Sequence, residues 1–216
     1  LKQHRDNDDV LIIDASKGFV KDGKQNKLRA CDIKRIADTV RDRKSIPGFS
    51  RAVSRDEIRQ NGYNLNIPRY VDSGEAAVQY DIYATMFGGI PENEIDSLEN
   101  YWQALPSLRG ELFQRNEDGS PYASVKVESI ADAINENADV KALKQSFVDA
   151  FAGFEDMLHD HLITNVMSVN EMKEQDAIAE EIFSRLQSIA LVDKYTAYQA
   201  LADNWQTIVN DIETIQ

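Results

Sequence analysis

The hydrophobic pattern of the chain changes near residue 73, and this change limits the fold more than any other feature. Before it, short β-branched runs alternate with amphipathic helical segments, which is the element order of an α/β sheet. After it, apolar residues recur at the three- and four-residue spacing of helices that bury one face. We therefore expect a mixed fold, in which the end of an α/β sheet precedes a mostly helical region.

The first segment is predicted to begin with a strand and a helix. The β-branched run at residues 10–13 has the length of a buried strand, and the stretch with Gly18 and Gly23 after it is predicted to be a loop. A helix is expected from about Asp32, with one apolar face formed by Ile33, Ile36, Ala37 and Val40.

The end of this segment combines an extended piece, a short helix and an alternating run. Residues 49–53 are predicted to be extended, and Ser54 with Glu57 has capping-box spacing, which predicts one or two helical turns before Asn61. Residues 63–67 alternate as a strand does, and Pro68 either ends the pairing or confines the strand to a sheet edge. Because these strands are too few for a complete sheet, only the last part of one is expected.

Apolar stripes predict the helices of the second region. One stripe occupies residues 140–158 and is weakened at Gly153, and two more occupy residues 178–189 and 195–212. Residues 122–127 are expected to form a short strand.

Charge divides the chain in a similar way. Residues 1–70 contain 16 basic and 10 acidic side chains, whereas the other 146 residues contain 8 and 27, so the net charges are +6 and −19. A basic surface can approach nucleic acid, and an acidic one is repelled by it. The alternative, that the excess charge only keeps each surface solvated, fits these numbers equally well.

The sequence lacks the motifs of a self-sufficient active site. None of its ten glycines forms a G-x-G pair, so no dinucleotide or Walker loop can be built. His159 and His161 are two residues apart, where a helix keeps their rings apart, so solvated histidines are favoured over a metal site. Cys31 has no disulfide partner, which favours a reducing compartment, the cytoplasm, and a half-buried side chain over a nucleophile. No apolar run approaches the roughly 20 residues of a membrane helix.

A stretch rich in arginine and asparagine is the best candidate for contact with DNA. Arginine side chains suit phosphate groups, and asparagine can bind the edge of an adenine. The candidates for contacts that bind DNA or close the domain are Arg51, Arg55, Asn64, Asn66, Arg69 and Tyr70.

Several strings resemble the modification subunits of type I restriction–modification systems. VLIIDAS at residues 10–16, QNKL at 25–28 and FSRAVS at 49–54 occur in the order found in that family. The most specific string, YNLNIPRYVD at residues 63–72, is similar to the segment that closes the family's methyltransferase domain. GGIP at residues 88–91 and LVDKY at 191–195 are similar to its long-tailed members.

The resemblance implies transfer of a methyl group from S-adenosylmethionine to N6 of an adenine that has left the base stack. It also implies assembly with a specificity subunit, which selects the DNA sequence, and with other modification and restriction subunits. The family's glycine-containing donor motif and its Asn-Pro-Pro-aromatic tetrapeptide are absent, because none of the five prolines follows an asparagine. No catalytic, donor-binding or metal-binding residue is therefore expected in this chain, which should be inactive alone.

The resemblance divides the chain into residues 1–72, the carboxy-terminal part of the α/β methyltransferase domain, and residues 73–216, an acidic helical tail for subunit assembly. Since the chain begins with Leu1, it is expected to be a piece of a longer protein, with an Asn-Pro-Pro-Tyr or Asn-Pro-Pro-Phe upstream. One alternative is a non-enzymatic acidic interaction protein that mimics the charge of DNA or acts as a scaffold. Another is a stand-alone DNA-binding module built on residues 41–70.

Overall fold

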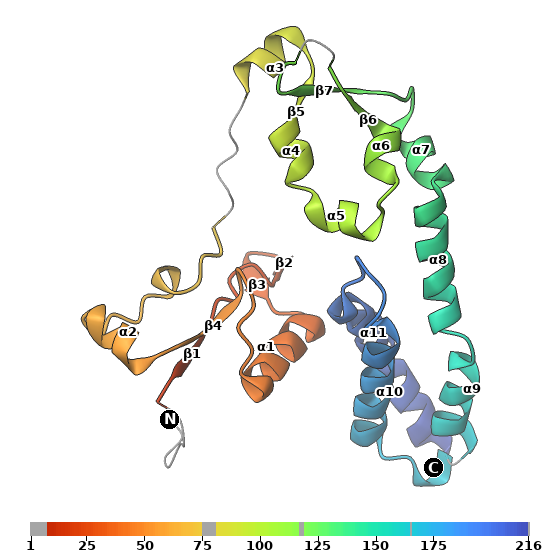
Figure 1. Cartoon of the computed structure of the whole chain (residues 1–216). Coiled ribbons are helices and arrows are strands. Elements are labelled where there is room, and N and C mark those ends of the chain that lie inside the picture. The colour runs from red at the N-terminus through yellow and green to blue at the C-terminus, as the bar shows by residue number, and fades with distance from the viewer. Residues whose placement is uncertain (1–7, 75–80, 117–118, 165, 216) are drawn as a thin grey trace. The chain divides into compact units, whose positions relative to one another are not determined.

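The computed structural model describes residues 8–74, 81–116, 119–164 and 166–215. The chain divides into two compact units (Figure 1). The first unit contains residues 1–77 and 195–206, and the second contains residues 78–194 and 207–216. Helices and small sheets occur together in the chain, so the predicted mixed and mostly helical composition is confirmed. Within the described residues, none of the helices is both long and apolar enough to cross a membrane.

The first unit contains a two-stranded antiparallel sheet. Strand β1 (Val10–Ile13) pairs with β4 (Ser50–Val53), with Val10 opposite Val53 and Ile13 opposite Ser50. Both strands were predicted, and both are confirmed. The helical elements of residues 8–74 are α1 (Ala30–Asp42), α2 (Arg55–Gln60) and the 3₁₀ turn η1 (Ile67–Arg69). The sheet, α2 and η1 enclose one core cluster, formed by Ile12, Val53, Ile58, Tyr70 and Val71.

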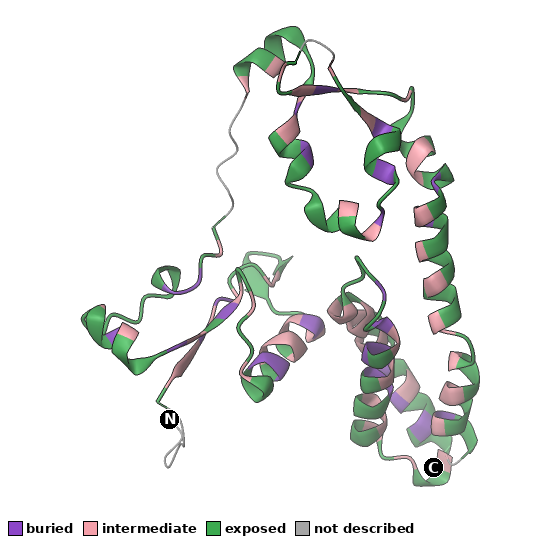
Figure 2. Ribbon diagram, viewed as in Figure 1, coloured by how far each residue is buried: buried purple, intermediate pink, exposed green. Residues whose placement is uncertain are grey.

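A β-hairpin occupies the stretch that was predicted to be a loop. Strand β2 (Val20–Asp22) pairs antiparallel with β3 (Gln25–Lys27). Gly23 adopts a φ of 60° in the turn between them, a conformation that costs glycine little. All six strand residues are exposed (Figure 2), so no apolar alternation marked these strands in the sequence.

The prediction of a strand at residues 63–67 is wrong. Tyr63 has a left-handed φ of 59°, and the backbone N–H of Asn66 donates to the side-chain oxygen of Asn64 at 2.9 Å. Such a local turn satisfies the backbone without a sheet partner. Pro68 then lies in the first turn of η1, where its missing N–H is tolerated.

Helix α1 lies where the sequence predicts it. Its predicted apolar face, however, is not the face that is buried. Ile33 and Val40 are more than half exposed, whereas Asp38 and Thr39 are buried. The buried polar groups have partners: Thr39 donates to the Arg35 carbonyl at 2.7 Å, and Asp38 accepts from Lys34 at 3.1 Å. Tertiary contacts within the unit therefore outweigh the amphipathic pattern of the helix.

The beginning of the last helix, α11 (Lys194–Ile215), belongs to the first unit. The side-chain oxygen of Gln199 accepts a hydrogen bond of 2.9 Å from the backbone N–H of Cys31, at the start of α1. The Arg35 guanidinium lies 4.4 Å from the Phe49 ring centre and 5.8 Å from that of Tyr195. The contacts of Gln199 and Tyr195 join parts of the first unit that are far apart in the chain.

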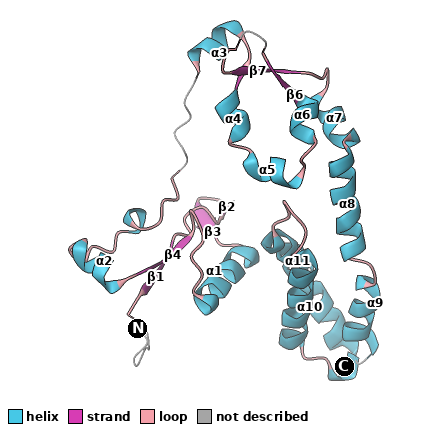
Figure 3. Cartoon of the chain, in the orientation of Figure 1, coloured by secondary structure: helices cyan, strands magenta, loops and turns pink. Residues whose placement is uncertain are grey.

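The second unit begins with a small sheet surrounded by short helices (Figure 3). Strands β5 (Ile90–Pro91), β7 (Tyr122–Val125) and β6 (Phe113–Arg115) pair antiparallel in that order, and β7 confirms the predicted strand. The short helices are α3 (Ile82–Phe87), α4 (Glu92–Asp96), α5 (Glu99–Ala104) and α6 (Leu108–Leu112). The core here is formed by Leu105, Leu108, Leu112 and Val140.

Further helical elements, both short and long, follow in the second unit. Their bounds are α7 (Ile130–Glu136), α8 (Ala138–Ala150), α9 (Phe154–His159), the π-helical η2 (Asp160–Thr164), the 3₁₀ turn η3 (Val166–Ser168) and α10 (Glu171–Leu186). Gly153, with a φ of 70°, lies between α8 and α9 and confirms the predicted weak point. The stripe predicted on α10 is buried, at Ile178, Ile182 and Leu186.

Candidate nucleic-acid interface

Asn64 and Tyr70, two of the sequence candidates, hold the chain between α2 and η1 in place. Tyr70 is buried in the core cluster of the first unit, and its hydroxyl donates to the Asn64 carbonyl at 2.5 Å. The Asn64 side chain accepts from the Asn66 backbone, as described above. Tyr70 therefore has its hydroxyl and its ring occupied within the chain, whereas Asn66 begins η1 with no side-chain cap bond and is exposed.

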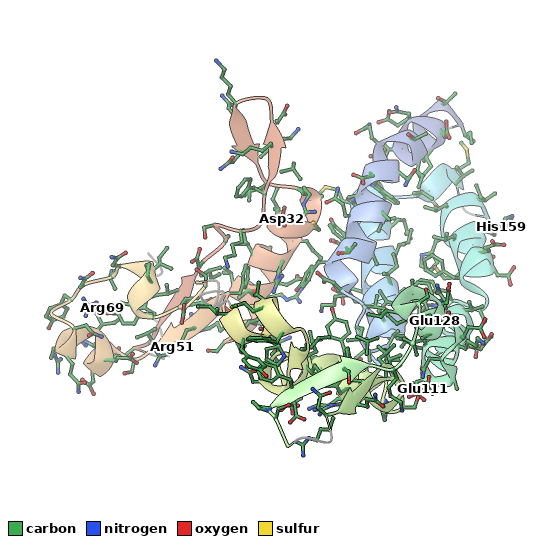
Figure 4. The ribbon with its side chains drawn as sticks, turned by 90° about the horizontal axis from the view of Figure 1, so that it is seen from above. Asp32, Arg51, Arg69, Glu111, Glu128 and His159 are labelled. Carbon is green, nitrogen blue, oxygen red and sulfur yellow. The ribbon has the colours of Figure 1, made fainter. Side chains whose placement is uncertain are left out.

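The three candidate arginines lie on the surface of the same unit. Arg51 forms an ion pair of 3.0 Å with Glu57, and Arg55 approaches Asp8 at 3.5 Å. Arg69 donates to the side-chain oxygen of Asn61 at 3.4 Å. Figure 4 labels Arg51 and Arg69 in the same part of the unit. Because exposed ion pairs contribute little free energy, these guanidinium groups can exchange their partners for phosphate.

Tyr63 and Leu65 lie on either side of Asn64 in the sequence, and both residues are more than half exposed. Tyr63 holds its left-handed backbone conformation without being a glycine. A conformation of this kind costs about 1–3 kcal/mol and persists only where the surroundings impose it. The bond between Tyr70 and Asn64, which fixes this loop, supplies that constraint.

The β2–β3 hairpin adds a basic element that the loop prediction missed. Its strands and turn carry Lys21, Lys24 and Lys27, with Asp22 as their one acidic side chain. The Lys21 ammonium donates to the side-chain oxygen of Asn26 at 2.7 Å and lies 5.5 Å from the Phe19 ring centre. At the base of the hairpin, Asp32 forms a capping box with Arg29 at the start of α1. Figure 4 shows the hairpin projecting beyond Asp32.

Asp14 follows β1 at the carboxyl end of the strand, where α/β sheets often place a functional carboxylate. Here the carboxylate accepts hydrogen bonds from the Ser16 backbone N–H at 2.9 Å and from the Ser73 hydroxyl. Hydrogen bonds from Ser16 and Ser73 lower the pKa of Asp14 below its usual value. Asp14 therefore connects the end of β1 to residue 73.

The histidines do not converge on one point. The His161 imidazole lies 2.7 Å from a Glu174 carboxylate oxygen, beside a cavity of about 390 Å³ lined by Asp160, His161, Ser168, Val169 and Glu174. His159 is instead 3.5 Å from the Thr164 hydroxyl. Among the residues that the structure describes, no three His, Cys, Asp or Glu side chains lie close enough to hold a metal ion.

Comparison with known proteins finds a family that is similar to the first segment. Residues 1–78 match the N-6 DNA methylase family. Over these residues the chain is similar to N-6 DNA methylases. The resemblance to type I modification subunits, seen in the sequence strings, is thereby confirmed.

The curated relatives are type I methylase subunits. The chain is 36% identical over 83 residues to the type I restriction enzyme MpnII methylase subunit of Mycoplasma pneumoniae, covering 38% of this chain and 15% of that protein. It is 32% identical over 111 residues to the MjaVIII methylase subunit of Methanocaldococcus jannaschii, covering 50% of this chain and 18% of that protein. The chain thus spans less than a fifth of the length of these relatives.

A solved structure is also similar over a limited part of the chain. It is the methyltransferase subunit of a type I restriction–modification system from Streptococcus thermophilus, with 47% identity over 33% of this chain and 15% of that one, and a TM-score of 0.33.

The residues of this chain do not fit a methyl-donor site. Donor binding in an α/β domain takes place at the carboxyl ends of parallel strands, beside a glycine-containing turn. All strand pairs in the described residues are antiparallel, and Asp14 already accepts bonds from Ser16 and Ser73. The sequence also contains no G-x-G and no Asn-Pro. The described residues therefore do not supply the parallel-strand edge beside a glycine turn that such a donor would occupy.

Proposed function

We propose that this chain is the carboxy-terminal portion of a type I modification subunit. The match of residues 1–78 to the N-6 DNA methylase family carries this proposal. Residues 1–72 would form the end of the methyltransferase domain and its Rossmann-like sheet, and residues 73–216 an acidic tail for assembly. The complete enzyme would transfer the methyl group of S-adenosylmethionine to adenine N6. The lone Cys31 supports a reducing compartment, the cytoplasm.

The inverted burial of α1 supports this assignment. A helix that exposes Ile33 and Val40 while burying Asp38 leaves apolar surface in water, which is unfavourable. An α/β domain covers such a helix face with further strands or helices. In the proposed complete subunit, the rest of the methyltransferase domain supplies that cover.

The candidate arginines and asparagines take two roles under this proposal. Arg51, Arg55 and Arg69 are exposed and would contact DNA phosphates, with Asn66 beside them. Asn64 and Tyr70 would close the domain, because one forms the turn and the other lies in the core.

Assembly through the tail needs exposed apolar side chains, and α3 provides them. Met86 is 70% exposed and Phe87 is 69% exposed, although α3 itself is fixed to the unit. Asp81 caps the helix at the Ala84 N–H, 2.9 Å away, and accepts from the Tyr122 hydroxyl at 3.0 Å. We assign this face to the specificity subunit or a neighbouring modification subunit.

Co-purification with the specificity subunit of the same system tests the assignment. A chain with both Met86→Ser and Phe87→Ser should lose the complex, because the changes remove exposed apolar surface without opening the core. A control with Lys141→Ser and Lys144→Ser should keep it. Unchanged assembly of the Met86/Phe87 variant would refute the role given to α3. Deleting residues 140–216 is a poorer test, since it also removes the part of α11 that belongs to the first unit.

A second candidate function is supported by the charge of the second unit. Its residues include 24 acidic and eight basic side chains, a net charge of −16. We propose as the alternative that this unit occupies a basic cleft of a partner as a DNA mimic. Competition with duplex DNA for that partner, weakening steeply with salt, would distinguish it from assembly through an apolar face.

A further inference from the structure

The β2–β3 hairpin is solvated on both faces. An isolated two-stranded hairpin is marginally stable in water, and strands are normally retained because one face packs on a core. Here all six strand residues are exposed, and Val20 is their one large apolar side chain. The hairpin therefore presents its side chains to solvent and adds none of its strand residues to a core.

The hairpin presents positive charge. Residues 17–29 contain five basic side chains and one acidic side chain. Arg29 is bound to Asp32 at 2.9 Å, and Lys27 lies 3.8 Å from Asp22. The Lys21 ammonium is held by the neutral Asn26, so its full charge is retained. Lys24 in the turn and Lys17, which precedes β2 and is attracted by the Asp14 carboxylate, complete with it a cationic ribbon of three lysines.

The base of the hairpin is fixed while its tip projects. A side chain at Gly18, two residues before β2, would approach a carboxylate oxygen of Asp32 to 3.0 Å, so the chain that leads into the hairpin lies close to α1. Asp32 in turn accepts from both the backbone and the guanidinium of Arg29. The ribbon is therefore held in one direction before it meets a ligand, which lowers the entropic cost of binding.

We propose that the β2–β3 hairpin binds the backbone of duplex DNA, with Lys17, Lys21 and Lys24 facing phosphate groups. The ribbon has suitable dimensions, because the major groove admits a two-stranded β-ribbon. The choice of DNA among polyanions rests on the proposed function, whereas the basic ribbon itself does not. Each lysine that neutralises a phosphate releases counterions, so affinity should fall steeply as salt rises.

Fluorescence anisotropy with a labelled duplex and the full chain tests this proposal. At low salt, the triple variant Lys17→Ala, Lys21→Ala, Lys24→Ala should bind at least about tenfold more weakly than the unchanged chain. The slope of log affinity against log salt should become shallower by roughly 2–3, about 0.9 for each phosphate that the variant no longer neutralises. The matched control is Lys141→Ala, Lys144→Ala, Lys173→Ala in the second unit, which should change neither value. Equal affinity and slope for the two triple variants, or no binding by the unchanged chain at low salt, would overturn the proposal.

Site-specific crosslinking gives a second readout that tolerates weak binding. Cys31 is buried, so a Lys24→Cys chain offers one accessible thiol for a photoreactive group. Crosslinking to duplex DNA should occur from position 24 and not from Lys144→Cys. Crosslinking from neither position, or equally from both, would contradict a contact at the hairpin. If instead the triple variant loses only self-association in sedimentation, the acidic unit of a second copy is the partner, and the DNA proposal is wrong.

The same triple variant separates this proposal from the function proposed above. It should still co-purify with the specificity subunit, because the hairpin lies outside residues 73–216. Loss of DNA binding with assembly intact supports both proposals. Failure of the unchanged chain to assemble counts against the proposed function alone, and unaltered DNA binding by an assembled variant counts against the hairpin alone.

Discussion

Asn137 is a buried polar residue whose replacement should lower the stability of the second unit. Its side chain is 2% exposed, and its oxygen accepts from the N–H groups of Asp139 at 2.9 Å and Val140 at 3.1 Å, which caps α8. Its amide nitrogen donates to the Ser107 hydroxyl at 2.8 Å and to Glu111 at 2.9 Å. One side chain thus connects α8 to α6 and the residue before it.

The loss in free energy of unfolding that we expect for Asn137→Ala follows from these four hydrogen bonds. Losing an N-cap costs about 1 kcal/mol, and the buried N–H of Val140 left without a partner adds about 1 kcal/mol. Ser107 and Glu111 are exposed, so water replaces their lost donor and the cost there is reduced to about 1 kcal/mol in total. The free energy of unfolding of the second unit should therefore fall by about 3 kcal/mol.

Urea unfolding followed by tryptophan fluorescence measures this change. Trp102 packs against the affected core cluster, and Trp205 belongs to the first unit. A Trp205→Phe background therefore makes the signal report the second unit alone. The control Asn135→Ala removes an exposed acceptor of Lys144 and should change stability by less than about 0.5 kcal/mol.

A comparison with Asn137→Asp separates the contribution of the helix cap from that of the two hydrogen bonds that the amide donates. Aspartate keeps the cap but brings a negative charge beside Glu111 and removes both donated bonds, so this variant should also be destabilised. Equal stability of Asn137→Ala and Asn135→Ala would show that the buried network contributes nothing, and the reasoning would fail. A stable Asn137→Asp would mean that the cap alone matters.

Three further results are expected. Tyr70→Phe should lower the stability of the first unit by about 1 kcal/mol, because the Asn64 carbonyl loses its donor, and amide exchange at residues 64–66 should accelerate. Hydrogen bonds lower the pKa of Asp14, so they contribute stability above its unfolded value of 3.8; the difference between the native chain and Asp14→Asn, measured by urea unfolding, should shrink as pH falls through the folded pKa. Gly153→Ala should cost about 1 kcal/mol in the same assay, since a side chain meets no atom there within 4 Å and only the φ of 70° is unfavourable.

The sequence predicted the structure correctly where interactions within one short segment determine it. The run at residues 10–13 is a strand, and the Ser54 hydroxyl accepts from the Glu57 N–H at 3.2 Å, as its spacing predicted. The buried stripe of α10 also follows from spacing alone. In each case the pattern, the propensity and the tertiary packing agree.

The errors have physical causes that the sequence does not display. Asn64 can bond to its own backbone two residues on, which competes with the strand that alternation suggested at residues 63–67. The hairpin strands bury nothing, so no periodicity marked them. Helix α1 receives contacts from Gln199 and Tyr195, which lie far along the chain and which the local pattern does not reveal.

The sequence also did not show which candidate site residues share a surface. Proximity in sequence grouped Arg69 with Tyr70, but one is on the surface and the other is in the core. The lysines of the hairpin were overlooked because a loop carries no expected direction for its side chains. Charge content can be read from the sequence, whereas the surface that displays it depends on the fold.

The bond between Cys31 and Gln199 has a consequence for biosynthesis. At about 5–20 residues per second, roughly 8–34 seconds separate the synthesis of these two positions. During that interval the ribosome produces the residues of the second unit between 78 and 194, while the first unit still lacks residues 195–206. A nascent chain stalled before Tyr195 should therefore expose the side of α1 that Gln199 and Tyr195 later contact, and should remain a substrate for chaperones until α11 emerges.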